Sequence, residues 1–242
     1  AANDSLTGNS GDNTLEGGGG DDLIDGLGGL DSASYAGAVS GVTVDLAIQG
    51  TAQDTGGAGN DTLTGIEGLV GSAHDDTLFG STGNNRILGG AGNDTILVSS
   101  ATTGFGAPGS DEFHGEDGDD IIGFALTGVG QGGPGTGHVM NGGAGTDTFV
   151  FETFTAGYRV DLTDETFQSA QGSAIGDLIG FENISAGSGD DVLHGNGAVN
   201  DIDGHDGDDE IEGGGGADDL DGGANGAGGD TVSYAQSGAG VT

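Results

Sequence analysis

Residues 186–221 decide the fold, and they read in blocks of nine: AGSGDDVLH (186–194), GNGAVNDID (195–203), GHDGDDEIE (204–212) and GGGGADDLD (213–221). Each block is rich in glycine at its start, has Asp or Asn at its sixth place and has Leu or Ile at its eighth. Glycine reaches left-handed backbone angles at no steric cost, so the first residues can turn sharply and expose their carbonyl oxygens. The last three residues then form a short strand whose middle side chain points inward.

This spacing predicts a coil of stacked turns. A chain that turns every nine residues needs two blocks to come full circle, and turns on the same side then stack about 4.8 Å apart. Stacking brings sixth-place carboxylates and turn carbonyls of successive coils together. A hard cation that takes six to eight oxygen ligands would fill such a gap, which points to calcium.

The composition first suggests a disordered acidic polymer. The chain has 242 residues with 59 glycines, 40 acidic against 2 basic residues and a net charge of −38. Like charges repel, and little apolar surface is available for burial. The periodicity favours an ordered coil instead, because a solvating tail has no reason to place an aliphatic residue in phase with an aspartate. We expect the coil to need a counter-cation, so that binding energy becomes folding energy.

The same composition argues against several partners and activities. Only Arg86 and Arg159 could neutralise phosphate, so nucleic acid is not expected as a partner, and no apolar run approaches the length of a membrane span. No H-E-x-x-H or G-x-S-x-G motif occurs, and G-x-G-x-x-G matches follow from the glycine content alone. We therefore predict that the chain is not an enzyme.

The repeats predict one elongated solenoid over residues 1–242, with regular repeats at 1–34, 56–97, 106–123, 142–150 and 186–230. Wider, off-register coils are expected at 35–70 and 148–185. The two resemble each other: GVTVDL (41–46) matches GYRVDL (157–162), and DTLTGIEGLVGSAHDDTLFG (61–80) matches GDLIGFENISAGSGDDVLHG (176–195). A third copy begins at Asp230, and both ends cut through repeats, so we expect a fragment of a longer array.

Taken together, these blocks resemble the RTX (hemolysin-type calcium-binding) repeat family. The resemblance implies an all-β, right-handed parallel β-roll or β-helix solenoid with calcium bound in glycine-rich turns. It also implies that the turn supplies carbonyls, that the sixth place supplies a side-chain oxygen, and that multiple Ca²⁺ ions lie between neighbouring turns. The candidate metal ligands are then Asp4, Asn13, Asp22, Asp31, Asp61, Asp76, Asn85, Asp94, Asp111, Asp120, Asp147, Asp191, Asn200, Asp209, Asp218 and Asp230.

Departures from the pattern lead to more specific expectations. Asn13, Asn85 and Asn200 offer a neutral oxygen, so their sites should be weaker or shared, and Val70 is expected to hold a sixth place without a ligand. An isolated aspartate could be a mere turn former, but many in register favour calcium. The five histidines are interpreted as surface residues.

The only concentration of aromatic residues is Phe149, Phe151, Phe154, Tyr158 and Phe167. These residues are interpreted as a larger core in a widened coil. A contact surface for another chain is the alternative.

These expectations favour a structural function outside the cell, where calcium is plentiful enough for weak sites. The first hypothesis is the body of a secreted or cell-surface bacterial adhesin, surface layer or extracellular-matrix filament, exported by type I secretion and associating with copies of itself. The alternative is a non-catalytic module of a secreted protease, lipase or uronan epimerase. A calcium buffer is a third reading.

Overall fold

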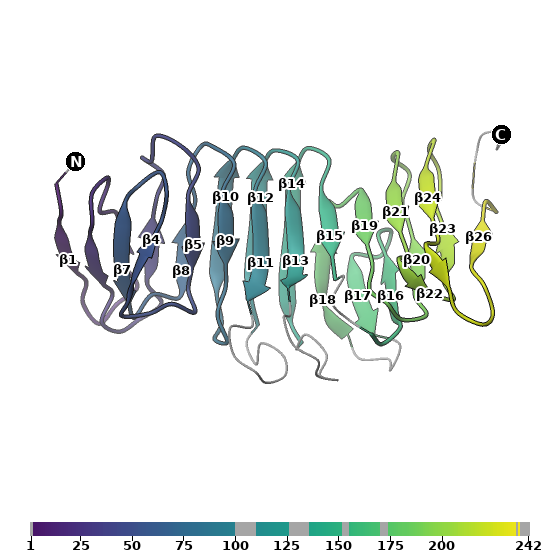
Figure 1. The fold of residues 1–242 in the computed structure, drawn as a ribbon, viewed down its shortest axis with the longest axis horizontal. Helices are drawn as coiled ribbons and strands as arrows, with labels where there is room; N and C mark the ends of the chain where they lie inside the picture. The colour runs from purple at the N-terminus through teal and green to yellow at the C-terminus, as the bar shows by residue number, and fades with distance from the viewer. Residues whose placement is uncertain are drawn as a thin grey trace.

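The computed structural model describes residues 2–99, 110–125, 136–151, 155–169, 174–235 and 237, and in these residues the chain is a flattened coil built from strands and turns. Successive coils follow one another along the long axis from the N-terminal to the C-terminal end (Figure 1). The chain alternates between two sides of the coil, and strands on each side pair with those one coil before and after. No helix occurs in the described part of the chain, so none is available there to cross a membrane.

One side of the coil is a twelve-stranded sheet. Its strands, in spatial order, are β2 (Thr14–Leu15), β4 (Ser32–Ser34), β8 (Gly68–Val70), β10 (Arg86–Ala91), β12 (Glu112–Asp117), β14 (His138–Ala144), β18 (Ala174–Ile179), β17 (Thr166–Ser169), β16 (Tyr158–Asp161), β20 (Val192–His194), β23 (Glu210–Glu212) and β26 (Thr231–Ser233).

The other side has a four-stranded and an eight-stranded sheet. The first contains β1 (Ser5–Thr7), β3 (Leu23–Asp25), β7 (Asn60–Thr64) and β6 (Ala52–Asp54). The second contains β24 (Asp219–Asp221), β21 (Asp201–Asp203), β19 (Asn183–Ser185), β15 (Thr148–Val150), β13 (Ile121–Ala125), β11 (Thr95–Ser99), β9 (Thr77–Phe79) and β5 (Thr43–Asp45). Two short turn strands, β22 (Asp206–Gly207) and β25 (Ala224–Asn225), pair with each other.

The eighth-place side chains form the core. Parallel pairing places Leu78 beside Ile96, Ile96 beside Ile122 and Ile122 beside Phe149, so the inward residues stack in one file. All four side chains are fully buried. The prediction of an all-β parallel coil with an inward eighth residue is therefore confirmed.

The two wider coils contain a feature that the repeat pattern did not predict. Strand β6 runs antiparallel to β7, and β17 runs antiparallel to both β16 and β18. In both places the chain after the VDL motif folds back and adds one strand in the opposite direction. All other strand pairs among the described residues are parallel, so these reversals widen the coil without ending it.

The aromatic residues lie in the core, as expected. Phe149 packs against Phe151, with ring centroids 5.6 Å apart, and against Phe181 at 5.9 Å. Phe151 in turn packs edge-on against Tyr158 at 5.6 Å. Of the residues grouped with them from the sequence, Phe154 and the side chain of Phe167 lie outside what the structure describes.

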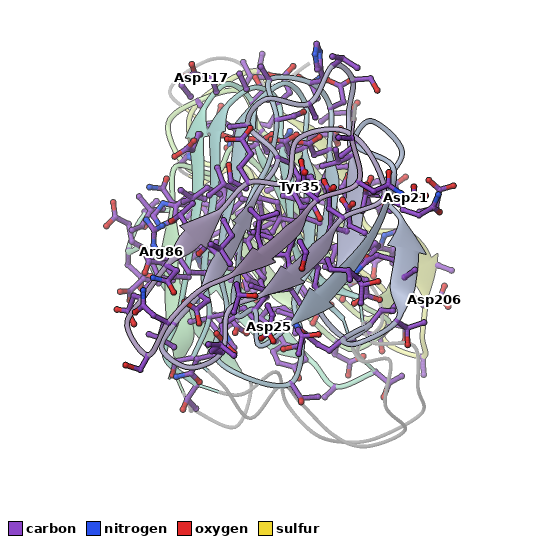
Figure 2. All side chains as sticks on the ribbon, turned by 90° about the vertical axis from the view of Figure 1, so that its left-hand side faces the viewer. Asp21, Asp25, Tyr35, Arg86, Asp117 and Asp206 are labelled. Atoms are coloured by element: carbon purple, nitrogen blue, oxygen red, sulfur yellow. The ribbon has the colours of Figure 1, made fainter. Side chains whose placement is uncertain are left out.

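Many of the acidic side chains lie at the periphery of the coil. Seen along the coil from its N-terminal end, Asp21, Asp117 and Asp206 are at the periphery and Tyr35 is near the middle (Figure 2). The acidic excess is therefore carried largely by exposed side chains around a thin apolar centre, apart from the sixth-place carboxylates described below.

Removing one core side chain tests the packing. Leu78→Ala should lower the free energy of unfolding by about 2–5 kcal/mol, because Leu78 is fully buried between neighbouring coils. The measurement is denaturant unfolding at saturating calcium. Leu30→Ala is the control, since Leu30 is 64% exposed and should change stability by less than about 0.5 kcal/mol. Equal losses in the two variants would contradict the assignment of the core.

Candidate metal centre

The sixth-place side chains join neighbouring coils in a ladder of hydrogen bonds. The amide of Asp76 donates to Oδ1 of Asp94 at 2.8 Å, and the amide of Asp94 donates to Oδ1 of Asp120 at 2.7 Å. The amide of Asp120 donates to Oδ1 of Asp147 at 2.8 Å. A buried amide must be paired, so each of these side chains satisfies the backbone of the coil before it.

The second oxygen of many of these carboxylates is buried and has no hydrogen-bond partner. Such an Oδ2 atom occurs at Asp22, Asp31, Asp94, Asp120, Asp147 and Asp209. Burying a charged oxygen without a partner costs several kcal/mol, and buried charges are normally paired or bound to metal. The regular recurrence of the unpaired atom therefore points to a ligand.

The glycine at the first place of each block has no side chain, which leaves a small space beside this oxygen. We call this space a cradle. A Cβ atom added at Gly115 would overlap Oδ2 of Asp120 and the carbonyl oxygen of Gly142, which belongs to the next coil. Gly142 faces Oδ2 of Asp147 and the carbonyl of Gly180 in the same way. A carboxylate oxygen and a carbonyl oxygen thus converge on both of these cradles.

Burial disfavours the charge on these carboxyl groups in the metal-free coil. Desolvation, together with repulsion from neighbouring carboxylates, raises the pKa of Asp94 to about 7 and that of Asp191 to about 7. The same causes raise the pKa of Asp147 to about 6. Burial also raises the pKa of Asp120 and of Asp209. A bound cation would remove this penalty by neutralising the charge.

The donor set fits a hard divalent cation. Calcium takes oxygen ligands from carboxylates and backbone carbonyls, which are the groups that meet in each cradle. No group of three or more His, Cys, Asp or Glu side chains able to hold a metal occurs among the described residues, so most ligands would come from the main chain. At the cradle before Asp120, the groups that would hold the ion are that carboxylate and the carbonyl of Gly142, and the ion would supply the missing positive charge.

The structure places the sixteen candidate ligands in two groups. Those with the side chain buried in the ladder are Asp22, Asp31, Asp61, Asp76, Asn85, Asp94, Asp111, Asp120, Asp147, Asp191, Asn200 and Asp209. Those nearer the ends, with more exposure, are Asp4, Asn13, Asp218 and Asp230. Whether each of them binds calcium remains a prediction.

Two glutamates belong to the ladder and were not anticipated. The amide of Asp31 donates to Oε2 of Glu67 at 3.0 Å, and the amide of Asp147 donates to Oε2 of Glu182 at 3.0 Å. Glu67 is therefore the sixth residue of its block, and the expectation that Val70 holds that place is wrong, because Val70 ends strand β8. The signal was present in the sequence as GIEG and GFEN, which occupy equivalent positions in the duplicated segments.

One histidine also takes a sixth place. His138 is 2% exposed, which corrects the interpretation of all five histidines as surface residues. Its Nδ1 lies 3.2 Å from both the amide nitrogen and Oδ2 of Asp111, in the position that Asp or Asn occupies in other coils. Its ring and that of Phe124 pack in a T-shaped arrangement with centroids 5.5 Å apart. Asp111 therefore faces an imidazole where other sixth places face a carboxylate.

A second polar site lies on the outer side of the coil. Arg159 forms a 2.6 Å ion pair with Asp161, and Nδ1 of His194 lies 3.4 Å from the same carboxylate. These residues and Glu212 line a hollow of about 480 Å³. It contains one of the two arginines of the chain, and Gly195, the first-place glycine of the turn before Asn200, also lines it.

Comparison with known families agrees with this geometry. The model of the RTX calcium-binding nonapeptide repeat (4 copies) matches residues 1–33, 55–68, 70–100, 101–123, 179–209 and 194–232. The chain belongs to the RTX calcium-binding repeat family. No curated protein matches the chain. The RTX repeat is a structural calcium-binding module with no catalytic role of its own, and proteins that carry it are typically secreted by bacteria.

Filling one cradle should prevent binding there. Gly115→Ala places a methyl group against Oδ2 of Asp120 and the carbonyl of Gly142, so fewer calcium ions should bind and a higher calcium concentration should be needed for folding. Equilibrium dialysis and circular dichroism measure the two effects. Gly28→Ala is the matched control, because no heavy atom lies within 4 Å of its added Cβ. The same calcium stoichiometry in both variants would contradict the cradle as a site.

Acid should partly replace calcium. The pKa of Asp94 rises from an ordinary 3.8 to about 7 in the metal-free coil, so protonation favours folding, and this stability is lost as pH rises from about 4 to about 7. In chelator, strand content measured by circular dichroism should therefore be higher at about pH 5 than at about pH 8. Calcium affinity should change in the opposite direction, because ligands must be deprotonated. Strand content in chelator that fell on acidification would contradict this account.

Proposed function

We propose that this chain is the calcium-folded structural body of a secreted or cell-surface bacterial protein, such as an adhesin, a surface layer or a matrix filament. It would leave the cell by type I secretion as an unfolded chain at low calcium and become a rigid rod outside. The observation that carries this proposal is the recurrence of a buried carboxylate oxygen without a partner, from Asp22 in the first coils to Asp209 near the last.

The balance of charge supports calcium as the condition for folding. A chain with net charge −38 repels itself, and most of its coils contribute only one eighth-place side chain from each side to the core. So thin a core buries little apolar surface against the entropy that is lost when the backbone is ordered. Multiple calcium ions along the ladder would supply charge neutralisation and the missing stability.

The internal duplication supports a structural function over an enzymatic one. The segments around Glu67 and Glu182 have the same ladder contact, so the chain repeats a whole architectural unit as well as its nonapeptides. Repetition of a unit lengthens a rod and presents the same surface more than once. The single solenoid over the whole chain and its place in a longer array are part of this proposal.

A non-catalytic module of a secreted protease, lipase or uronan epimerase is the alternative function. A full-length gene with further copies of the unit would favour the structural body, and one with a catalytic domain beside the repeats would favour the module.

A calcium titration tests the proposal. Far-ultraviolet circular dichroism should change from a disordered spectrum in chelator at neutral pH to a strand spectrum at about 10⁻⁴ to 10⁻³ M calcium, the affinity range of extracellular modules. Small-angle scattering should show the chain contracting to a rod over the same range. Magnesium at equal concentration is the control, since it demands a tighter octahedral site. A complete strand spectrum in chelator at neutral pH would refute calcium-dependent folding.

Light scattering separates the structural body from a calcium buffer. If copies of the chain associate once folded, the apparent mass should rise with protein concentration in calcium and return to the monomer in chelator. A buffer would fill its sites with no change in mass.

A further inference from the structure

We propose that the side chains of Asn85 and Asn200 close their turns by hydrogen bonds, without calcium. We call these two side chains staples, and they would hold two of the turns in the coil independently of the ion. The inference rests on the proposed function, because it assigns which turns of a calcium-folded coil do not use the ion. It replaces the expectation that these asparagines form weak or shared calcium sites.

The Asn85 amide group makes the contacts that a cation would otherwise make. Its Oδ1 accepts the amide hydrogen of Ser81 at 2.6 Å, four residues earlier and inside the same turn. Its Nδ2 donates to the carbonyl of Glu67, one coil earlier, at 2.9 Å. The side chain thus has both an acceptor and a donor in use, and the network itself fixes which atom is oxygen.

Asn200 makes the same pair of contacts. Its Oδ1 accepts the amide hydrogen of Asn196 at 2.9 Å, and its Nδ2 donates to the carbonyl of Glu182. The sixth-place aspartates of the following turns differ, because Asp94 and Asp209 each keep one buried oxygen without a partner. Neutral asparagine leaves no such atom and no charge to be neutralised.

The backbone of the turns falls into two classes. In the turns before Asp31, Asp120 and Asp209, the second residue has a positive φ although it is not glycine: Leu27 at 71°, Glu116 at 77° and His205 at 62°. Such a conformation is costly for these residues and is retained where the surroundings require it. The turns before Asn85 and Asn200 have Ser81 and Asn196 at this place, without a positive φ, and their amide hydrogens face the side chain. The turn before Asp76 shares this backbone, because the amide of Ser72 donates to Oδ2 of Asp76, so the neutral side chain is what sets the two asparagines apart. We call the first class open turns and the second closed turns.

The cradle before Asn85 is also lined by different groups. A Cβ added at Gly80 would meet Oδ1 of Asn85 at 3.1 Å and the ring tip of Phe113 at 3.2 Å, and these two side chains are its nearest neighbours. At Gly89, in the next turn along, the corresponding neighbours are Oδ2 of Asp94 and the carbonyl of Gly115. An aromatic carbon thus takes the place of a carbonyl ligand.

The cradle before Asn200 retains a carbonyl, that of Gly213. This turn therefore differs from the open turns in the side-chain amide of Asn200 and in the residue before it that the amide contacts. It therefore offers a place where a site could be created.

The two staples are equivalent in the duplicated unit. Asn85 follows Glu67 by 18 residues, and Asn200 follows Glu182 by 18 residues, and in both copies the amide holds the carbonyl of that glutamate. Each pair lies in the coil next to a wide coil, where an antiparallel strand interrupts the regular stacking. A turn closed without calcium at that point would keep the chain in register with the regular coils after it leaves the wide coil.

The slope of unfolding against calcium tests the assignment. The logarithm of the unfolding constant falls with the logarithm of free calcium, with a slope that counts the ions released on unfolding. Asn85→Ala and Asn200→Ala should each lower the melting temperature and leave this slope unchanged. Asp94→Ala and Asp209→Ala, which are the matched sixth-place substitutions, should each reduce the slope by about one ion. A smaller slope in either asparagine variant would overturn the proposal.

A gain of binding provides a second test that does not depend on a weakened variant. Asn196→Gly with Asn200→Asp gives this turn the two residues of an open turn, and the carbonyl of Gly213 is already in place. The double variant should bind about one calcium ion more than the parent by equilibrium dialysis. An unchanged number of ions would overturn the assignment of Asn200. Failure of the proposed function would look different, because the parent slope itself would be zero.

Discussion

The structure depends on a carboxylate group whose two oxygens have different partners. One oxygen holds the amide of the preceding coil, as Asp120 does for Asp94, and it is required by the backbone whether or not a metal is bound. The other oxygen faces a glycine and a carbonyl of the following coil. Stacking the coils therefore creates an array of negative oxygens that stacking alone cannot neutralise. The contacts that set the geometry of the fold therefore also leave buried carboxylate oxygens that a bound cation would neutralise.

This constraint explains why the coil can be so thin. An ordinary domain of this length would bury a thick core, whereas here a few files of eighth-place residues such as Leu78 and Ile96 separate the sheets. The aromatic group around Phe149 is the main enlargement, and it lies beside the second wide coil, where more space has to be filled. Elsewhere the ladder contributes order that a larger core would otherwise provide.

The regular part of the fold could be predicted from the sequence because its periodicity is local. An aliphatic residue every nine positions fixes which side chains point inward, and parallel stacking then fixes the register of Leu78 with Ile96. The wide coils could not be predicted in the same way. Their antiparallel strands β6 and β17 have no repeat to mark them, because they pair with nearby segments as hairpins, Ala52 with Thr62 and Arg159 with Gln168, outside the nine-residue period.

The candidate site was predictable in type but not in every member. The sixth-place aspartates follow directly from the repeat, whereas Glu67 enters the ladder because a longer side chain can replace Asp where the coil is wider. The register of the repeat shifts at the wide coil, so a continuous count of nines from Gly56 predicts Val70 at that place instead. The burial of His138 is not predictable in this way, because a lone histidine in a degenerate block follows no pattern, and only its contact with the amide of Asp111 shows its place.

The ladder also implies that calcium sites along the coil act together. An ion beside Asp94 would restrain the carboxylate of Asp94, whose Oδ1 holds the amide of Asp76 in the coil before it. That restraint orders the turn of Asp76, so less conformational entropy is lost when an ion binds at that turn. Neighbouring sites would therefore fill cooperatively. The coils around the staples at Asn85 and Asn200, which are already closed by hydrogen bonds, are where ordering would cost least and could start.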